Sequence, residues 1–293
     1  MKLKIGIIGI KGKFGQRLSD FFKQQDYDVI GSDVMTDITN TQVVEQSDVV
    51  IFSVPIASVV SVINKVAEFS REGQLFIDVT SIKGPAVDAM LRSKADVVGL
   101  HPMFAPTVNT FRGQVIVRCD ARLTDIWKPW VEEILEATRA TIKKSTPVEH
   151  DKYMAVVQAL PHAVNLIMAR VICSLGVDVV ESMSYTSPFY KIAFGLIGRI
   201  LSKDSSMYAS IQMENPHVPK ILEVLEHETM RFRAIIETEN RVFRDQSFNA
   251  DHSSSVGHFG GAPIASADRF FDDIIGLMSD LSEENMFVLE AET

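Results

Sequence analysis

Residues 4–15 read KIGIIGIKGKFG, a β-branched run that passes directly into a turn containing Gly9, Gly12 and Gly15. Glycines permit a tight turn and let backbone N–H groups approach a pyrophosphate at the start of a helix. The next residues, FGQRLSDFFKQQ, place their large apolar side chains on one helical face. The stretch therefore predicts a strand, a phosphate-binding turn and a helix.

The second predicted strand, residues 28–33, ends in Asp33, about 20 residues beyond the turn, where a carboxylate can bind a ribose 2′-hydroxyl. A carboxylate also repels a 2′-phosphate, which favours NAD over NADP. The third strand ends in FSVP, residues 52–55, a sequence suited to the floor beside a nicotinamide ribose. We expect the cofactor to contact Gly9, Ile10, Gly12, Lys13, Phe14, Gly15, Asp33, Ser53, Val54 and Pro55.

Short β-branched runs alternate with amphipathic stretches through the first half of the chain. Continuous apolar strands separated by helices are typical of a parallel sheet covered on both faces. We therefore predict a doubly wound, Rossmann-type α/β domain over residues 1–147. The expected strands are residues 4–9, 28–33, 48–54, 74–79, 96–100 and 114–119.

The second half, residues 148–293, has a helical pattern. Residues 151–176 are apolar nearly all round, and Pro161 predicts a kink or break there. A further helix begins with Ser187 as N-cap and Pro188 in its first turn, and another covers residues 219–243. Residues 251–264 read as a Gly/Ser-rich loop before a last amphipathic stretch. Because these helices are so apolar, we expect an all-helical domain that forms a homodimer.

Composition narrows the class of protein. The chain has 293 residues, a net charge of −9 and no basic run, so nucleic acid is not an expected partner. Cys119 and Cys173 form neither a disulfide framework nor a metal site. We read no signal peptide at the N-terminus and no uncharged run of ~20 apolar residues for a membrane span. We therefore expect a soluble cytoplasmic protein without a metal.

Polar residues stand at the ends of the fourth and fifth predicted strands. DVTSIKG, residues 78–84, supplies Ser81 and Lys83, and VVGLHPMFAP, residues 97–106, supplies His101. Ligands of open α/β sheets bind outside the carboxyl ends of the strands. These three side chains should therefore lie near the nicotinamide ring and a small-molecule substrate, with Lys83 as a substrate-binding group.

Several segments resemble the prephenate dehydrogenases of tyrosine biosynthesis and their arogenate-using relatives, from about residue 4 to about residue 245. The likeness is greatest to the dehydrogenase half of the bifunctional chorismate mutase–prephenate dehydrogenases. It is carried by the glycine turn and by DVTSIKG, GLHPMFAP, VEHDKYMAVVQALPHAVN and TSPFYKIAFGLIGRI. The resemblance implies that NAD oxidises the C4 alcohol of prephenate while the ring carboxylate leaves as CO2, giving 4-hydroxyphenylpyruvate.

The resemblance also implies roles for individual residues. His101 would be the catalytic base, and Ser81 would hydrogen-bond His101 or the substrate hydroxyl. Arg199 would bind a substrate carboxylate, and His150 and His162 would line the substrate cleft. The residue types suit these roles, because histidine titrates near neutral pH and a guanidinium binds a carboxylate through two hydrogen bonds. Capping of a helix is an equally weighted role for His150.

Other functions stay open at this stage. Arogenate and 4-amino-4-deoxyprephenate each differ from prephenate by an amino group, so the same scaffold and base can serve all three. A non-catalytic sensor of a dinucleotide and an aromatic ligand is a rival of another class, which would be expected to lack His101 or Arg199. A β-hydroxyacid dehydrogenase using Lys152 or Lys191 would leave the HPMF segment without a role.

Overall fold

The computed structural model describes residues 2–202 and 205–250, with side chains up to residue 238. The chain forms two compact units, residues 1–221 and 222–293. The Gly/Ser-rich loop and the last amphipathic stretch expected from the sequence lie outside the described residues.

A seven-stranded sheet in the order β2-β1-β3-β4-β5-β6-β7 organises the first unit. β1 to β5 are mutually parallel, as the alternating pattern predicts, whereas β6 runs antiparallel to β5. A parallel return needs a long crossover, usually a helix, and the loop of residues 103–114 contains none. The strands are β1 Lys4–Ile8, β2 Asp28–Ser32, β3 Val49–Phe52, β4 Leu75–Asp78, β5 Asp96–Pro102, β6 Val115–Arg122 and β7 Thr141–Lys144.

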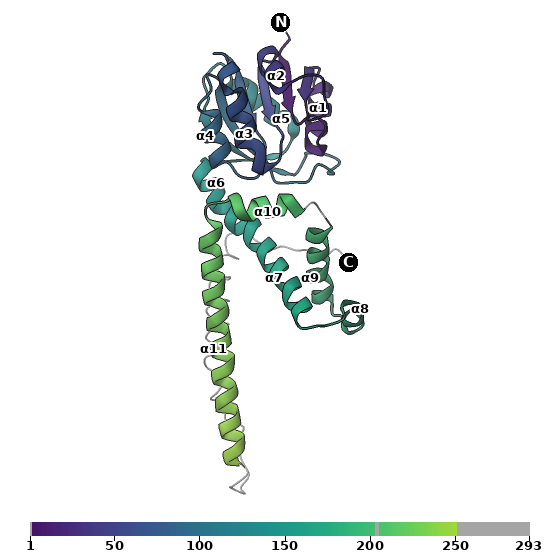
Figure 1. Ribbon diagram of the computed structural model, residues 1–293, viewed down its shortest axis with the longest axis vertical. Helices are drawn as coiled ribbons and strands as arrows, with labels where there is room; N and C mark the ends of the chain where they lie inside the picture. The colour runs from purple at the N-terminus through teal and green to yellow at the C-terminus, as the bar shows by residue number, and fades with distance from the viewer. Residues whose placement is uncertain (1, 203–204, 251–293) are drawn as a thin grey trace. The chain divides into compact units, whose positions relative to one another are not determined.

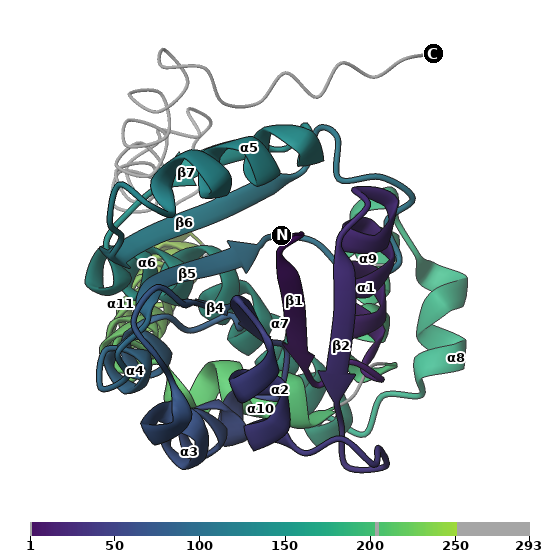
Figure 2. The same ribbon diagram turned by 90° about the horizontal axis from the view of Figure 1, so that it is seen from above.

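Both faces of the sheet are buried, which confirms the doubly wound class. Alternate residues of β3 point to opposite faces, so Val50 and Phe52 join one apolar core while Val49 and Ile51 join the other. Figure 2 shows the helices on the two sides of the strands. One core packs against α2 (Asn40–Gln46), α3 (Ile56–Val66) and α4 (Gly84–Met90), and the other against α1 (Lys13–Gln24) and α5 (Lys128–Thr138).

The sheet differs from the sequence prediction in two respects. The predicted parallel pairing holds for β1 to β5, whereas β6 pairs antiparallel with β5 for the reason given above. The prediction also omitted β7, whose sequence TIKK is short, polar and mostly exposed. β7 pairs in parallel with β6 alone, so it is an edge strand that needs no apolar pattern on both faces.

The chain becomes helical at α6 (Pro147–Met154), next to the predicted domain boundary. A π-helical turn, Ala155–Ala159, separates α6 from α7 (Leu160–Ser174). The turn precedes Pro161, which has no N–H to donate and whose ring crowds the carbonyl four residues earlier. The expected break at Pro161 is thus realised as a widened turn.

The remaining helices include one whose start was predicted residue by residue. Ser187 accepts a hydrogen bond from the Tyr190 N–H, and Pro188 is the first residue of α9. Figure 1 shows α9 beside α7. The helices are α8 (Val179–Ser182), α9 (Pro188–Leu201), α10 (Ser205–Glu214) and α11 (Val218–Ala250), of which the sequence reading missed α8 and α10.

A small apolar cluster joins these helices to the sheet domain within the first unit. Ala155, Ala159, Ile211 and Val218 are buried together, with Ile56 at the start of α3 packed against them. The cluster brings the π-helical turn, α10 and the first turn of α11 against the edge of the sheet that carries the strand ends. α6, which runs directly into the π-helical turn, contacts α4 and β6.

The outward face of α7 stays apolar and exposed. Val164, Ile167 and Val171 of α7 are exposed although they are apolar, and so are Val156 and Val157 in the π-helical turn before it. In the part of the chain that the structure describes, Pro147–Ser174 is the one helical run long and apolar enough to span a membrane, by length and composition alone. This is weak grounds for a membrane span, because a subunit interface requires the same exposed apolar face.

Candidate active site

The glycine turn lies where β1 meets α1. Gly9 has φ +91°, and its N–H donates to the Ser32 carbonyl over 2.8 Å. A Cβ on Gly15 would lie 2.1 Å from the Gly9 carbonyl oxygen. No side chain caps the first turn of α1, so its N–H groups remain available to an anion such as a pyrophosphate. These features fit a bound dinucleotide.

The neighbouring strand ends complete this cradle. The Asp33 carboxylate accepts hydrogen bonds from the Lys11 N–H at 2.9 Å and the Val34 N–H at 2.8 Å, which joins the end of β2 to the glycine turn. Ser53 donates its N–H to the Ile8 carbonyl, and Pro55 precedes the first residue of α3. The predicted cofactor residues therefore gather at one edge of the sheet.

Replacing Gly15 by alanine should abolish most cofactor binding. The new methyl group meets backbone atoms of Gly9 and Ile10, which cannot move away as a flexible side chain can. Gly12→Ala is the matched control, because its Cβ would lie 3.2 Å from the Gly9 oxygen and needs a shift of only a few tenths of an ångström. Calorimetric titration with NAD should show at least a roughly 10-fold weaker Kd for Gly15→Ala, about 1.4 kcal/mol. Unchanged affinity would contradict this account of the turn.

His101 lies near the carboxyl end of β5 and begins a chain of three buried polar side chains. Its Nδ1 is 2.9 Å from Nε2 of His150, and Nδ1 of His150 is 2.7 Å from Oδ1 of Asp151. His101 is only 3% exposed, and His150 and Asp151 are buried with it. The sequence separates His101 from His150 by 49 residues, so the docking of α6 beside β5 creates the contact.

Asp151 is anchored on the start of α4. Its Oδ1 accepts the Lys83 N–H at 2.7 Å and its Oδ2 accepts the Gly84 N–H at 2.8 Å. The Asn215 side-chain amide donates to the Asp151 carbonyl at 2.8 Å. The start of α4 therefore holds the Asp151 carboxylate and Asn215 holds the Asp151 backbone, which together fix the histidine ring beside it.

Lys83 forms a buried ion pair with Asp78, the last residue of β4. Both side chains are 0% exposed, and Lys83 Nζ also donates to the Leu100 carbonyl at 2.8 Å. The Asp78 carboxylate accepts the Thr80 N–H as well. The predicted substrate-binding role of Lys83 does not agree with this placement, because its ammonium group is sealed and already paired.

Burial sets the protonation of the histidines. It lowers the pKa of His101 well below the usual value of 6.5, and the nearby His150 and Lys83 lower that pKa further. Burial also lowers the pKa of His150, although the hydrogen bond to Asp151 opposes this shift. For Asp151, burial raises the pKa, but hydrogen bonds from His150, Lys83 and Gly84 outweigh it and the pKa is lowered. Near neutral pH the site holds two neutral imidazoles and one carboxylate.

The other predicted site residues are not part of the hydrogen-bonded row formed by His101, His150 and Asp151. Ser81 is half-buried in the turn between β4 and α4, and the described residues show no hydrogen bond between Ser81 and His101, whose Nδ1 is bonded to His150. His162 lies on α7 with its ring 4.8 Å from that of Tyr208. Arg199 lies exposed on α9, and among the described residues its guanidinium has no partner. Within that part of the chain, no hydrogen bond or ion pair joins His162 or Arg199 to His101.

His150 also differs from its predicted roles. Both ring nitrogens are occupied by protein atoms and the side chain is 0% exposed, so direct contact with a substrate does not fit. The helix is capped by Thr146, which accepts the Glu149 N–H, rather than by His150. The sequence reading missed Asp78 and Asp151 as site residues, although both stand inside the quoted DVTSIKG and VEHD segments.

A doubly wound sheet with a glycine turn after β1 and an acid at the end of β2 is typical of dinucleotide-binding proteins. Two family models match the chain: "Prephenate dehydrogenase, nucleotide-binding domain" over residues 23–144 and "Prephenate dehydrogenase, dimerization domain" over residues 146–245. The chain belongs to the prephenate dehydrogenase family, whose members act in tyrosine biosynthesis.

Individual relatives agree with the family. A "Probable arogenate/prephenate dehydrogenase" of Methanocaldococcus jannaschii is 27% identical over 98% of this chain and 68% of its own length. The T-protein of Haemophilus influenzae is 29% identical over 76% of this chain, which spans 59% of that relative. The crystal structure of A. aeolicus prephenate dehydrogenase with hydroxyphenyl propionate and NAD+ has a TM-score of 0.68 at 18% identity, covering 86% of this chain and 97% of that one. This last likeness establishes the fold.

Proposed function

We propose that this chain is an NAD-dependent prephenate dehydrogenase in which His101 is the base. One observation carries the proposal: His101 Nε2 has no hydrogen-bond partner among the described residues and is not one of the polar atoms sealed from solvent. A neutral imidazole nitrogen is thus free at the carboxyl edge of the sheet, where substrates of this fold bind.

In the proposed reaction, a base must hold the proton of the substrate hydroxyl until the product forms. His101 Nε2 takes the proton of the substrate C4 hydroxyl as the hydride leaves C4. The electron pair of the bond to the ring carboxylate enters the ring as CO2 departs, and His101 returns its proton to the phenolic oxygen of 4-hydroxyphenylpyruvate. Bound NAD supplies the hydride acceptor. General-base assistance of this kind is worth ~10²–10⁴ in rate.

We assign substrate binding to residues outside the histidine chain. The exposed Arg199 guanidinium is unpaired among the described residues and suits a substrate carboxylate. We also propose that the half-buried Ser81 hydroxyl binds the substrate hydroxyl and that His162 contacts the substrate. We do not retain Lys83 or His150 as direct substrate ligands.

NAD is proposed over NADP on the position of Asp33. Its carboxylate stands at the end of β2, held by the Lys11 and Val34 N–H groups, where it disfavours a 2′-phosphate. The nearby ammonium of Lys11 donates to the Met35 carbonyl at 2.7 Å, so it is already engaged. The NAD+ in the related A. aeolicus structure is consistent with this choice.

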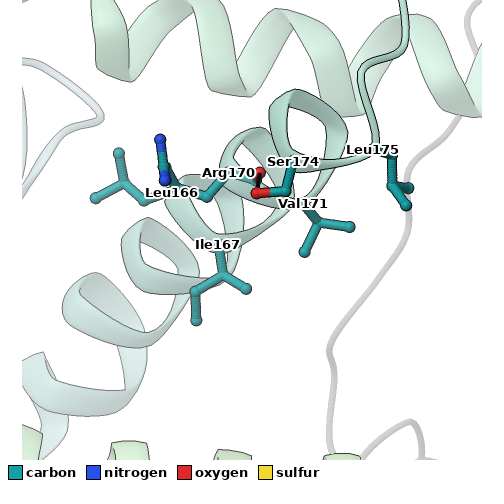
Figure 3. Close-up of a pocket in the computed structure, with 6 residues that line it drawn as sticks. All are labelled: Leu166, Ile167, Arg170, Val171, Ser174 and Leu175. Atoms are coloured by element: carbon teal, nitrogen blue, oxygen red, sulfur yellow. Dashed lines mark hydrogen bonds between the residues drawn. The ribbon is translucent and has the colours of Figure 1, made fainter.

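A homodimer is proposed from the exposed face of α7. Leu166, Ile167, Arg170, Val171, Ser174 and Leu175 line an open hollow of about 360 Å³ on this face (Figure 3). All six belong to α7 and the residue that follows it, so among the described residues no second element forms an opposite wall. Together with the match to a dimerization domain, this favours contact with a second copy over a substrate pocket.

Substrate and cofactor choice are tested by initial rates of NADH formation. We expect kcat/KM to be highest with prephenate and NAD, and lower with arogenate or with NADP. The printed name of the Methanocaldococcus relative covers both substrates, which makes arogenate the second candidate. A higher kcat/KM for arogenate would change the substrate and keep the base. Turnover with neither, despite NAD binding, would favour the amino-substituted ring or a sensor.

The pH profile should show where His101 loses its function. His101 acts only as the neutral base, so a lowered pKa keeps it active at pH values where a free histidine is already protonated. We expect kcat/KM to stay level down to pH 6.5 and to fall only below it, measured in buffers of constant ionic strength. An acid limb with its midpoint at or above 6.5 would contradict the burial of the base.

A further inference from the structure

We propose that Asp151 and His150 are positioning residues that fix the tautomer of His101, placing its proton on Nδ1 and leaving Nε2 as the proton acceptor. The catalytic meaning of this inference rests on the proposed function, but the tautomer itself is a property of the free protein. The starting observation is the continuous bonding from the α4 start through Asp151 and His150 to His101.

The direction of every bond follows from Asp151. Its two oxygens accept the backbone N–H groups of Lys83 and Gly84, which can only donate. As an ionised carboxylate Asp151 has only acceptor sites, so the bond at 2.7 Å from Oδ1 to His150 must be donated by the His150 Nδ1–H. Neutral His150 then has a lone pair at Nε2.

The tautomer of His150 then determines the tautomer of His101. The Nε2 lone pair of His150 can only accept, so the bond of 2.9 Å to His101 is donated by the His101 Nδ1–H. Neutral His101 consequently carries no proton on Nε2. A doubly protonated His150 would reverse this bond, but its side chain is 0% exposed and the Lys83 ammonium is close enough to disfavour a second positive charge.

The hydrogen-bonded row of His101, His150 and Asp151 also supplies the negative charge that balances His101 when it takes up a proton. The charged groups nearest His101 are the Lys83–Asp78 pair and, on the far side of His150, the Asp151 carboxylate. Because Asp78 is already paired with Lys83, the Asp151 carboxylate is the negative charge that can stabilise an imidazolium at His101. The proton does not need to pass on to His150 or Asp151, since His101 returns it to the product oxygen.

The tautomer can be measured by nitrogen NMR on the full chain labelled with 15N-histidine, without cofactor or substrate, at pH 7.5. The His101 signals are assigned by their loss in His101→Asn. We expect a protonated Nδ1 and an unprotonated Nε2 at His101, and a protonated Nδ1 at His150. A His101 proton on Nε2 overturns the inference, even if the enzyme turns over prephenate.

His150→Leu tests the dependence on the middle residue. We expect the His101 proton to distribute between both nitrogens, and kcat to fall on the order of 10²-fold with little change in KM, because His150 does not touch substrate. His227→Asn, at an exposed residue of α11, is the matched control and should leave the tautomer and kcat unchanged. An unaltered His101 tautomer in folded His150→Leu would refute the positioning role. If that variant does not fold, the wild-type spectrum alone decides.

The two proposals fail separately. Absence of turnover with prephenate contradicts the proposed function and leaves the measured tautomer unaffected. A wrong tautomer with full turnover contradicts only the positioning role of Asp151 and His150.

Discussion

His101→Asn should reduce kcat for NADH formation from prephenate by about 10²–10⁴-fold, the usual worth of a general base. Asparagine cannot accept the hydroxyl proton at neutral pH, yet its amide is polar and short enough to occupy the buried position beside His150. The effect should fall on kcat, with little change in the Kd for NAD, because the glycine turn is formed by β1 and α1 rather than by β5.

The measurement is steady-state formation of NADH, with NAD affinity determined separately by calorimetry. His227→Asn serves as the control, since His227 lies exposed on α11 with its side chain 75% exposed. Activity within a few-fold of wild type in His101→Asn would remove His101 as the base. Loss of both activity and NAD binding would show that the substitution disrupts the fold instead.

Lys83→Met should cost about 3–5 kcal/mol of the free energy of unfolding, the usual penalty for breaking a buried ion pair. The substitution keeps an apolar stem of similar length but leaves the sealed Asp78 carboxyl group without its ammonium partner. It also removes the hydrogen bond to the Leu100 carbonyl, one residue before His101. Denaturation in urea at pH 7.5 measures the loss.

The double variant Asp78→Asn with Lys83→Met is the matched control for this prediction. It removes both charges and retains an oxygen that can accept the Thr80 N–H. Most of the lost stability should therefore return, because a neutral pair needs no counter-charge in the interior. A single variant that loses less than about 1 kcal/mol, or a double variant no more stable than the single one, would contradict the role assigned to the ion pair.

Local sequence signals predict much of the fold. The glycine turn after β1 and the alternation of apolar strands with amphipathic helices indicate a doubly wound sheet, because each signal reflects backbone geometry within a few residues. The Ser187 N-cap and the distortion before Pro161 were predictable for the same reason. The antiparallel direction of β6 could not be predicted from local signals, because it depends on the path that the loop of residues 103–114 takes from β5 to β6.

The candidate site likewise has features that the sequence predicts and features that it does not. The place of His101 near a strand end follows from the apolar run before it. The partners of Lys83 and His150 do not, because Lys83 and Asp151 are 68 residues apart in sequence and meet only when α6 docks beside α4. The pairing of Asp78 with Gly99 across β4 and β5 similarly decides which polar atoms become neighbours. The hydrogen-bond partner of a lysine or histidine at a strand end therefore cannot be predicted from the sequence before the fold is known.

The most direct test of the central claim is the stoichiometry of products formed by the wild-type chain from prephenate and NAD. We predict equal amounts of NADH, CO2 and 4-hydroxyphenylpyruvate. NADH without CO2 would contradict oxidative decarboxylation, and NAD binding with no NADH formed from prephenate would contradict the proposed activity altogether.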